Sequence, residues 1–253
     1  MNKEQILDTR LKLTEFITQL QKTYYKPEDI EELLELRHYK GTPYEDKYRK
    51  LFNEIKIFKM PIEMLSRLFL TKYTPQEQKE MGLENVRMLE GRFMIPIRDL
   101  VGNIVTVTSW SATSNVKYIT LPTLGFSKRL QYFNEECLDL ERPVYIVEGV
   151  FDVLTLRMLG KQVLGAIGLD LSLVKEEKLK KYKKVICITD NDTQGHKTNP
   201  YIEKNEKNWK IPVENLFIGL PEGIKDADDL CKSYAEVDKV LDTLEKEVGF
   251  IQL

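Results

Sequence analysis

The second half of the chain alternates short apolar runs with segments of helical periodicity, and no other feature constrains the fold as strongly. Four runs favour strands: PVYIVE, QVLGAIG, KVICIT and VENLFIGL. Helices are predicted between them over VFDVLTLRML, from Leu173 to Lys183, and after Gln194. Strands and helices that alternate in this way form a parallel sheet covered by helices. The sequence therefore predicts a small doubly wound α/β unit, followed by an amphipathic helix near residues 234–248.

The first 140 residues have a different pattern. Glu, Lys and Leu are frequent up to about residue 80, and stretches such as EDIEELLELRHY carry apolar residues at helical spacing. After Gly91, the strand-like runs FMIPI and NIVTVTSW are joined by DLVGN, whose residues favour a hairpin turn. We therefore predict a helical segment over 1–80, a basic subdomain with strands over 81–140, the parallel-sheet domain over 141–232 and a C-terminal helix over 233–253.

Charge and cysteine content exclude several classes of protein. Lys and Arg number 38 against 40 Asp and Glu, so a net charge of −2 creates no overall field that would attract nucleic acid or a membrane. The three cysteines and two histidines are too scattered for a structural zinc site or a disulfide framework. The N-terminal residues are charged, and no apolar run approaches the length of a membrane span, so we predict a cytoplasmic protein.

Acidic residues follow three of the predicted strands. Glu148 ends the first strand, Gly149 allows a tight turn, and Asp152 lies on the first turn of the next helix. The others are Asp190 and Asp192 after KVICIT, and Asp226 and Asp228 in the loop after VENLFIGL. Carboxylates gathered at the carboxyl edge of a parallel sheet repel one another, so the set predicts a site for Mg²⁺ or Mn²⁺. Taken singly, Asp152, Asp192 and Asp228 are equally well explained as helix caps or turn residues.

Three short segments occur in a characteristic order: VEGVFDV, TDNDTQG and PEGIKDADDL. Together they resemble the three motifs of the TOPRIM domain, which primases, topoisomerases and some nucleases share. Ahead of them, GRFMIPIRDLVGNIV, KYITLP, FSK and QYF resemble segments that precede TOPRIM in DnaG-type bacterial and phage primases. The resemblance covers about residues 82–230. It implies an α/β fold in which a Rossmann-like parallel sheet flanked by helices follows a small strand-containing subdomain and N-terminal helices.

The resemblance also implies roles for individual residues. Catalysis would fall to Glu148, Asp190 and Asp192, and metal would be held by these three together with Asp152, Asp226 and Asp228. Residues implied in binding nucleic acid or nucleotide are Arg92, Lys117, Tyr118, Lys128 and His196, with Tyr118 stacking on a base and His196 touching a phosphate. Most of them lie in or near residues 86–134, where six basic residues outnumber two acidic ones.

The implied activity is that of a DNA primase core, which joins nucleotides on a single-stranded DNA template with Mg²⁺ or Mn²⁺ and without zinc. Its expected partners are the template, nucleoside triphosphates and a replisome or template-binding protein, and no membrane. Two alternatives stay open. The same carboxylates would serve a metal-dependent nuclease, and a degenerate primase relative would bind nucleic acid or a replisome protein without catalysis.

Two departures from the family affect these expectations. The cysteine and histidine content cannot build the zinc-binding module of DnaG-type primases, which implies a reduced catalytic core of the kind expected from a phage or mobile element. The segment TVTSWSA stands where the family has a Gly-rich turn that ends in Arg, so Trp110 and Ser111 replace that turn. Contact with the template is therefore expected to differ from that of the family.

Overall fold

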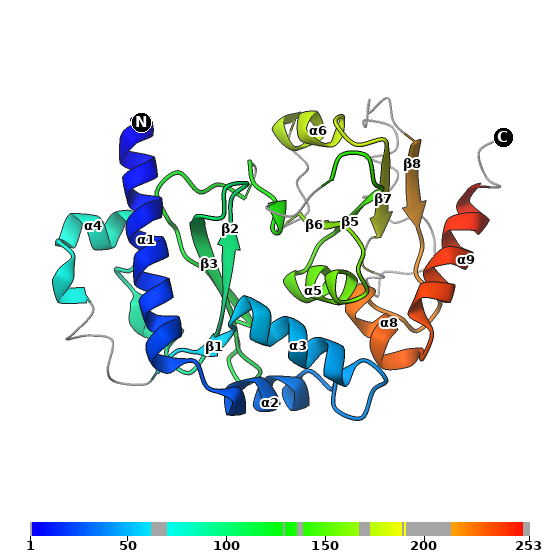
Figure 1. Cartoon of the computed structure of the whole chain (residues 1–253), viewed down its shortest axis with the longest axis horizontal. Helices are drawn as coiled ribbons and strands as arrows, with labels where there is room; N and C mark the ends of the chain where they lie inside the picture. The colour runs from blue at the N-terminus through cyan, green and yellow to red at the C-terminus, as the bar shows by residue number, and fades with distance from the viewer. Residues whose placement is uncertain are drawn as a thin grey trace. The chain divides into compact units, whose positions relative to one another are not determined.

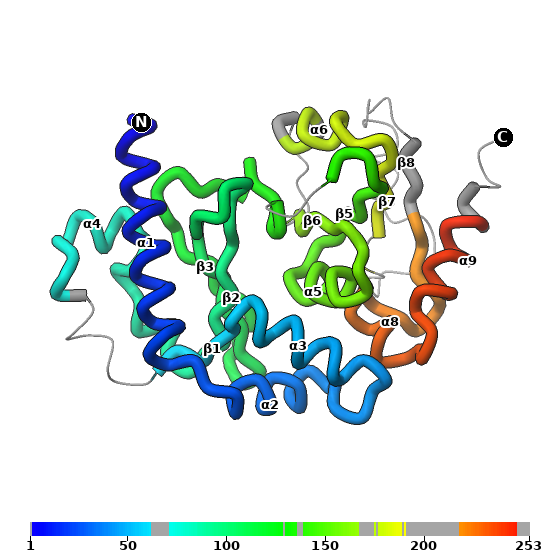
Figure 2. Tube along the Cα trace, viewed as in Figure 1, coloured from blue at the N-terminus to red at the C-terminus, as the bar shows by residue number. Residues whose placement is uncertain are grey.

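The computed structural model describes residues 2–61, 70–128, 130–135, 139–166, 173–188, 190 and 214–249 (Figure 1). The chain divides into two compact units. The first comprises Met1–Lys40 and Glu45–Phe126, and the second comprises Gly41–Tyr44 and Ser127–Leu253. In Figure 2 the blue to green part of the tube follows the first unit, and the green to red part follows most of the second.

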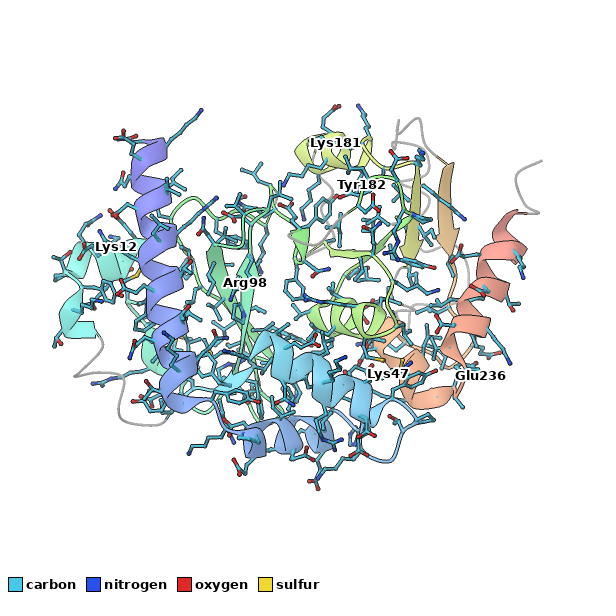
Figure 3. The ribbon with its side chains drawn as sticks, viewed as in Figure 1. Lys12, Lys47, Arg98, Lys181, Tyr182 and Glu236 are labelled. Atoms are coloured by element: carbon cyan, nitrogen blue, oxygen red, sulfur yellow. The ribbon has the colours of Figure 1, made fainter. Side chains whose placement is uncertain are left out.

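The first unit begins with the helices that the N-terminal periodicity predicts. Their bounds are α1 (Lys3–Tyr24), α2 (Pro27–Leu36), α3 (Glu45–Ile55) and α4 (Pro75–Glu80), with 3₁₀ turns over Leu70–Lys72 and Val86–Leu89. Local sequence explains where they start. Asn2 caps α1 by accepting a hydrogen bond from the backbone N–H of Glu4 (3.1 Å), and Thr74 and Glu77 form a reciprocal capping box at α4. Lys12 of α1 reaches Glu77 at a distance of 2.7 Å, which joins α1 to α4 (Figure 3).

An antiparallel sheet completes the first unit. Its strands are β1 (Phe58–Lys59), β2 (Phe93–Arg98), β3 (Ile104–Trp110) and β4 (Tyr118–Thr120), in this order across the sheet. The predicted hairpin between β2 and β3 is confirmed. The Asp99 carboxylate accepts hydrogen bonds from the backbone N–H groups of Val101 (3.1 Å) and Asn103 (3.0 Å), and Gly102 supplies the positive φ of 87° that the turn requires.

Helix α1 packs against β3 in the first unit. The Thr14 hydroxyl of α1 accepts a hydrogen bond from the backbone N–H of Ile104 (2.8 Å). One face of the helix is buried with the sheet in a common apolar core, which includes Leu13, Phe16, Ile17, Leu20, Met94 and Val107. Burying each such side chain contributes about 1.5–3 kcal/mol relative to leaving it exposed, so the amphipathic pattern of α1 determines its place on the sheet.

The second unit contains the predicted parallel sheet. Its strands are β5 (Val144–Val147), β6 (Val163–Gly165), β7 (Lys184–Ile188) and β8 (Glu214–Ile218), in the order β6-β5-β7-β8. The helices of this unit that the structure describes are α5 (Val150–Met158), α6 (Leu173–Leu179), α8 (Ala227–Ser233) and α9 (Val237–Gly249). All strand pairs are parallel. From β5 the chain passes to β6 on one side, and it then crosses to β7 on the other side of β5. The strand order therefore reverses between β5 and β7, and a switch point lies at their carboxyl ends.

Three details of this unit differ from the sequence prediction. Helix α6 ends at Leu179 rather than Lys183, because the chain turns there and Tyr182 is buried in the core (Figure 3). The Lys175 side chain is buried and donates to the carbonyl of Ala166, although its Lys-rich surroundings predict a solvated face. Part of the predicted loop PEGIKDADDL forms helix α8. The helix predicted after Gln194 lies outside the described residues.

Candidate functional site

The predicted carboxylates lie where strands of the parallel sheet end and the next helices begin. Glu148 is half-buried and follows β5 directly, and Asp190 comes two residues after the end of β7. Asp152 lies in the first turn of α5, and Asp226 is the N-cap of α8. Asp190 and Asp226 both act on the pKa of Asp152, so side chains separated by long stretches of sequence share one electrostatic environment.

Asp152 is the buried centre of this group. One carboxylate oxygen, Oδ2, accepts a hydrogen bond from the backbone N–H of Gly149 (3.0 Å), and Oδ1 accepts one from the backbone N–H of Asp228 (2.9 Å). The pKa of Asp152 is raised to about 8, mainly by burial and in addition by the neighbouring carboxylates of Asp226, Asp190 and Asp228. Because three carboxylates add to the effect of burial, negative charge is concentrated around Asp152.

Asp228 is also buried, with 1% of the residue exposed. The Thr155 hydroxyl of α5 donates to its Oδ1 (2.9 Å), and Lys232 Nζ donates to its Oδ2 (2.6 Å). Lys232 was not predicted as a site residue. Its spacing of four residues from Asp228 on one helix is a signal that the sequence contains.

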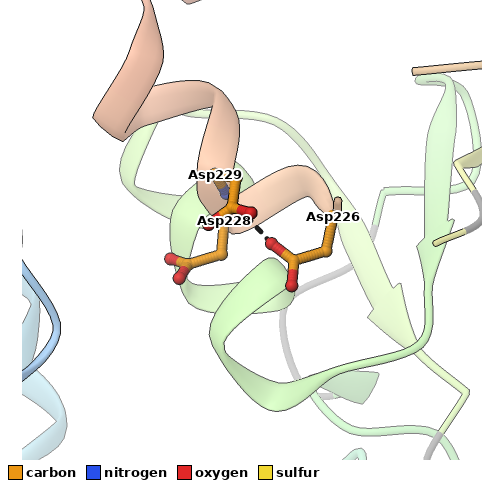
Figure 4. A group of neighbouring side chains, drawn as sticks. All are labelled: Asp226, Asp228 and Asp229. Atoms are coloured by element: carbon orange, nitrogen blue, oxygen red, sulfur yellow. Dashed lines mark hydrogen bonds between the residues drawn. The ribbon is translucent and has the colours of Figure 1, made fainter. Parts of the chain in front are cut away.

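The start of α8 carries two further carboxylates beside Asp228. Asp226 caps the helix, because its Oδ1 accepts a hydrogen bond from the backbone N–H of Asp229 (3.0 Å; Figure 4). Carboxylate oxygens of Asp226, Asp228 and Asp229 lie within 4.8 Å of one another. Burial raises the pKa of Asp226, and Asp229 and Asp228 add to that effect. Asp229 was not predicted as a site residue, although it stands in the run DADD.

This donor set fits a hard divalent cation. All the groups are carboxylate oxygens, which Mg²⁺ and Mn²⁺ prefer over nitrogen or sulphur ligands. Burial and, after it, mutual repulsion raise the pKa values of Asp152 and Asp226, and a bound cation would relieve the repulsion. Among the described residues, Lys232 pairs with Asp228 and Asp229, and Lys225 lies 3.9 Å from Asp226, so positive charge near the group is limited.

The predicted nucleic-acid residues occupy different environments. Arg92 is only 4% exposed and donates to the Ser109 hydroxyl (2.9 Å) and to the carbonyls of Val116 (2.8 Å) and Lys117 (2.7 Å). Its guanidinium therefore supports the β3–β4 loop from inside, whereas the sequence analysis expects it in a nucleic-acid groove. Lys117 is exposed on that loop, and Tyr118 is 44% exposed at the start of β4.

The remaining predicted residues belong to the second unit. Lys128 is exposed close to the start of that unit's main segment. Asp192 and His196 lie outside the described residues, so their predicted roles stay predictions.

The departure at TVTSWSA has a structural explanation in the first unit. Trp110 is 4% exposed, with its ring 5.9 Å from that of Phe93 and 5.3 Å from the guanidinium carbon of Arg37. The indole is therefore a core residue with a cation–π contact. Ser111 accepts a hydrogen bond from the backbone N–H of Ser114 (3.3 Å), which shapes the loop that leads to Lys117.

The sequence and the fold are both similar to those of known proteins. Residues 145–231 match the Toprim-like family. The DnaG primase catalytic domain bound to single-stranded DNA has a TM-score of 0.71 and 20% sequence identity, covering 95% of this chain and 80% of that one. The chain has the fold of a DnaG primase catalytic core. The comparison with curated proteins gave no match.

Two further DnaG-type structures have the same fold. The catalytic core of E. coli primase has a TM-score of 0.68 and 19% identity, covering 93% of this chain and 80% of that chain. The zinc-binding and RNA polymerase domains of the Aquifex aeolicus primase have a TM-score of 0.72 and 20% identity, covering 93% of this chain and 60% of that chain. These likenesses establish the architecture, and the fold prediction from sequence is confirmed.

The Toprim-like match contains the whole acidic group. It begins at Tyr145 in β5 and ends at Cys231 in α8, so Glu148, Asp152 and Asp228 all lie inside it. Lys232 follows the last matched residue.

None of the described helices combines the length and the apolar composition that a bilayer-spanning segment requires.

Proposed function

We propose that this chain is a DNA primase core, a metal-dependent nucleotidyltransferase that synthesises short primers on single-stranded DNA. One observation carries the proposal: carboxylates that follow β7, begin α5 and begin α8 share one electrostatic environment, in a chain with the fold of the DnaG catalytic core. The fold positions the acidic group at the carboxyl edge of the parallel sheet, where ligands of open α/β sheets bind.

The chemistry of primer synthesis suits this group. The 3′-hydroxyl oxygen of the growing strand forms a bond to the α-phosphorus of the incoming nucleotide, the bond to the β-phosphate oxygen breaks, and pyrophosphate leaves. When bound, Mg²⁺ or Mn²⁺ would neutralise the charge that develops on the phosphate oxygens. Asp190, Asp226 and Asp229 are the residues of this chain that would hold it. Glu148 is half-buried at the end of β5, and we assign it the proton of the attacking hydroxyl.

Template and nucleotide contacts fall to exposed residues outside the acidic group. We assign phosphate contacts to Lys117 and Lys128 and base stacking to Tyr118, whose ring is 44% exposed. Arg92 contributes indirectly, because it donates to the successive carbonyls of Val116 and Lys117 and so fixes the backbone that carries the Lys117 side chain. One of the similar DnaG structures was determined with single-stranded DNA, which supports this choice of template.

The charge of the chain also suggests a partner. Neutralised phosphates supply most of the affinity for DNA, and with a net charge of −2 the chain as a whole has no excess of positive charge. We propose that a replisome or template-binding protein supplies additional template contacts and raises the local concentration of the strand.

The Lys117→Ala variant is expected to weaken binding to single-stranded DNA and to make it less dependent on salt. Losing one phosphate contact should reduce the slope of log K against log salt by about 0.7. Fluorescence anisotropy with a labelled oligonucleotide at several salt concentrations measures the slope. Lys22→Ala, at an exposed lysine near the end of α1, is the matched control. Equal slopes for the two variants would place Lys117 outside the template path.

A priming assay tests the proposed function directly. The full chain is incubated with unprimed single-stranded DNA, labelled nucleoside triphosphates and Mg²⁺ or Mn²⁺, and the products are separated by length. We expect short labelled products in this reaction and none in a parallel reaction that contains EDTA from the start. End-labelled template in a parallel reaction distinguishes the alternatives: shortened template would indicate a nuclease, and unchanged template without primers would indicate a binding module.

A further inference from the structure

A lysine in the last turn of α8 reaches back to the carboxylates at the start of that helix. Lys232 Nζ is 2.6 Å from Asp228 Oδ2 and 3.0 Å from Asp229 Oδ1. The Lys232 side chain is 23% exposed, whereas that of Asp228 is 1% exposed. The ammonium group therefore compensates a carboxylate that has almost no contact with solvent.

The contacts of Asp228 continue into helix α5. Its second oxygen, Oδ1, accepts from Thr155, and its backbone N–H donates to Asp152 Oδ1. Asp152 in turn accepts from the backbone N–H of Gly149. A continuous series of hydrogen bonds thus runs from Lys232 through Asp228 and Asp152 to the start of α5. Both oxygens of Asp228 and both of Asp152 take part in it, whereas Asp226 uses one oxygen to cap α8.

This pattern separates the carboxylates into two kinds. Asp152 and Asp228 have protein donors on every oxygen, which suits residues that fix the geometry of the site. Asp226 and Asp229 lie at the more exposed side of the group, within reach of a cation from solvent. A buried carboxylate whose partner is removed keeps an uncompensated charge, which is strongly destabilising.

We propose that Lys232 is the resident counter-ion of the acidic group. It neutralises Asp228, holds that side chain against α5 and lowers the negative charge that a divalent cation meets at Asp226 and Asp229. Lys232 is thus a positioning residue, and in the absence of metal it stabilises the folded arrangement of these carboxylates. The proposal rests on the proposed function in one respect, because it takes a divalent cation as the ligand of the group.

The test is a pair of measurements on the Lys232→Met and Lys232→Arg variants of the full chain. Thermal melting in EDTA reports the role in the metal-free protein, and Mn²⁺ titration followed by electron paramagnetic resonance reports cation binding. Lys239→Met is the matched control, because Lys239 pairs with Glu236 at 2.6 Å on a neighbouring helix end, where both side chains are exposed.

We expect Lys232→Met to melt at least about 5 °C below the Lys239→Met control in EDTA. It should also bind Mn²⁺ on the order of tenfold more tightly than the parent, since one unit of positive charge near the cation is removed. Lys232→Arg retains the charge and should resemble the parent in both measurements. If Lys232→Met melts like the control, or if its Mn²⁺ affinity is unchanged, the proposal is wrong.

A second variant covers the case in which Lys232→Met does not fold. The double variant Asp228→Asn with Lys232→Met removes both charges and keeps an oxygen for the Thr155 hydroxyl. It should fold and melt above Lys232→Met, and failure to recover would contradict the counter-ion role. A parent chain that binds no Mn²⁺ would instead contradict the proposed function, and the EDTA comparison alone would then decide the role of Lys232.

Discussion

Replacing Gly149 with alanine is expected to lower the free energy of unfolding by about 3 kcal/mol. An added Cβ would lie 2.3 Å from Asp152 Oδ2, far inside van der Waals contact. The carboxylate would have to move, although it is buried and accepts hydrogen bonds from Gly149 and Asp228. Losing these bonds leaves buried polar groups without partners, which costs about 1–3 kcal/mol for each group.

Urea denaturation of the two proteins measures this difference. Gly219→Ala is the matched control, because Gly219 lies in the same unit, has no positive φ, and its added Cβ would meet nothing within 4 Å. The control should unfold at nearly the same urea concentration as the parent. Equal midpoints for Gly149→Ala and Gly219→Ala would show that the Asp152 carboxylate is free to shift.

The role of Gly149 could be predicted only in part from the sequence. The Glu-Gly pair predicts a tight turn after a strand, and the turn is present. The glycine is needed for another reason, since its φ of −90° is open to any residue and the Asp152 carboxylate occupies the space of a Cβ. That reason depends on a side chain three residues ahead, whose orientation a spacing rule does not give.

The strands were predictable because apolar, β-branched runs between turn residues have few alternative structures. The direction of charged side chains was not. Arg92 and Lys117 both lie in a basic stretch, yet one is buried beneath the loop and the other is exposed on it. The partners of the Arg92 guanidinium are the Ser109 hydroxyl and two backbone carbonyls, and carbonyls are present at every position of a sequence, so no pattern points to them.

The acidic group was partly predictable for a related reason. Parallel strands place their carboxyl ends at one edge, so Glu148 and Asp190 follow from topology. The contact between Thr155 and Asp228 joins residues 73 positions apart and depends on how α5 packs against α8. For this reason the sequence predicts that the carboxylates lie together, but it does not distinguish those that fix the geometry of the site from those open to a cation.

The Glu148→Gln variant is expected to reduce primer synthesis by about 10³-fold while leaving the fold intact. The substitution preserves the shape of a half-buried side chain and removes its charge and its ability to accept a proton. Initial rates of nucleotide incorporation at saturating template measure the effect. Glu222→Gln, at an exposed residue of the loop before α8, is the matched control and should keep the parent rate.

Two further measurements on this variant decide how Glu148 acts. If it accepts the proton of the attacking hydroxyl, Mn²⁺ affinity should be close to that of the parent, and the rate should lose its rise with pH. If it is a metal ligand, Mn²⁺ affinity should fall together with the rate, and higher Mn²⁺ should restore part of the activity. A variant with the parent rate would remove Glu148 from the chemistry altogether, and Asp190 at the end of β7 would then be the carboxylate to test.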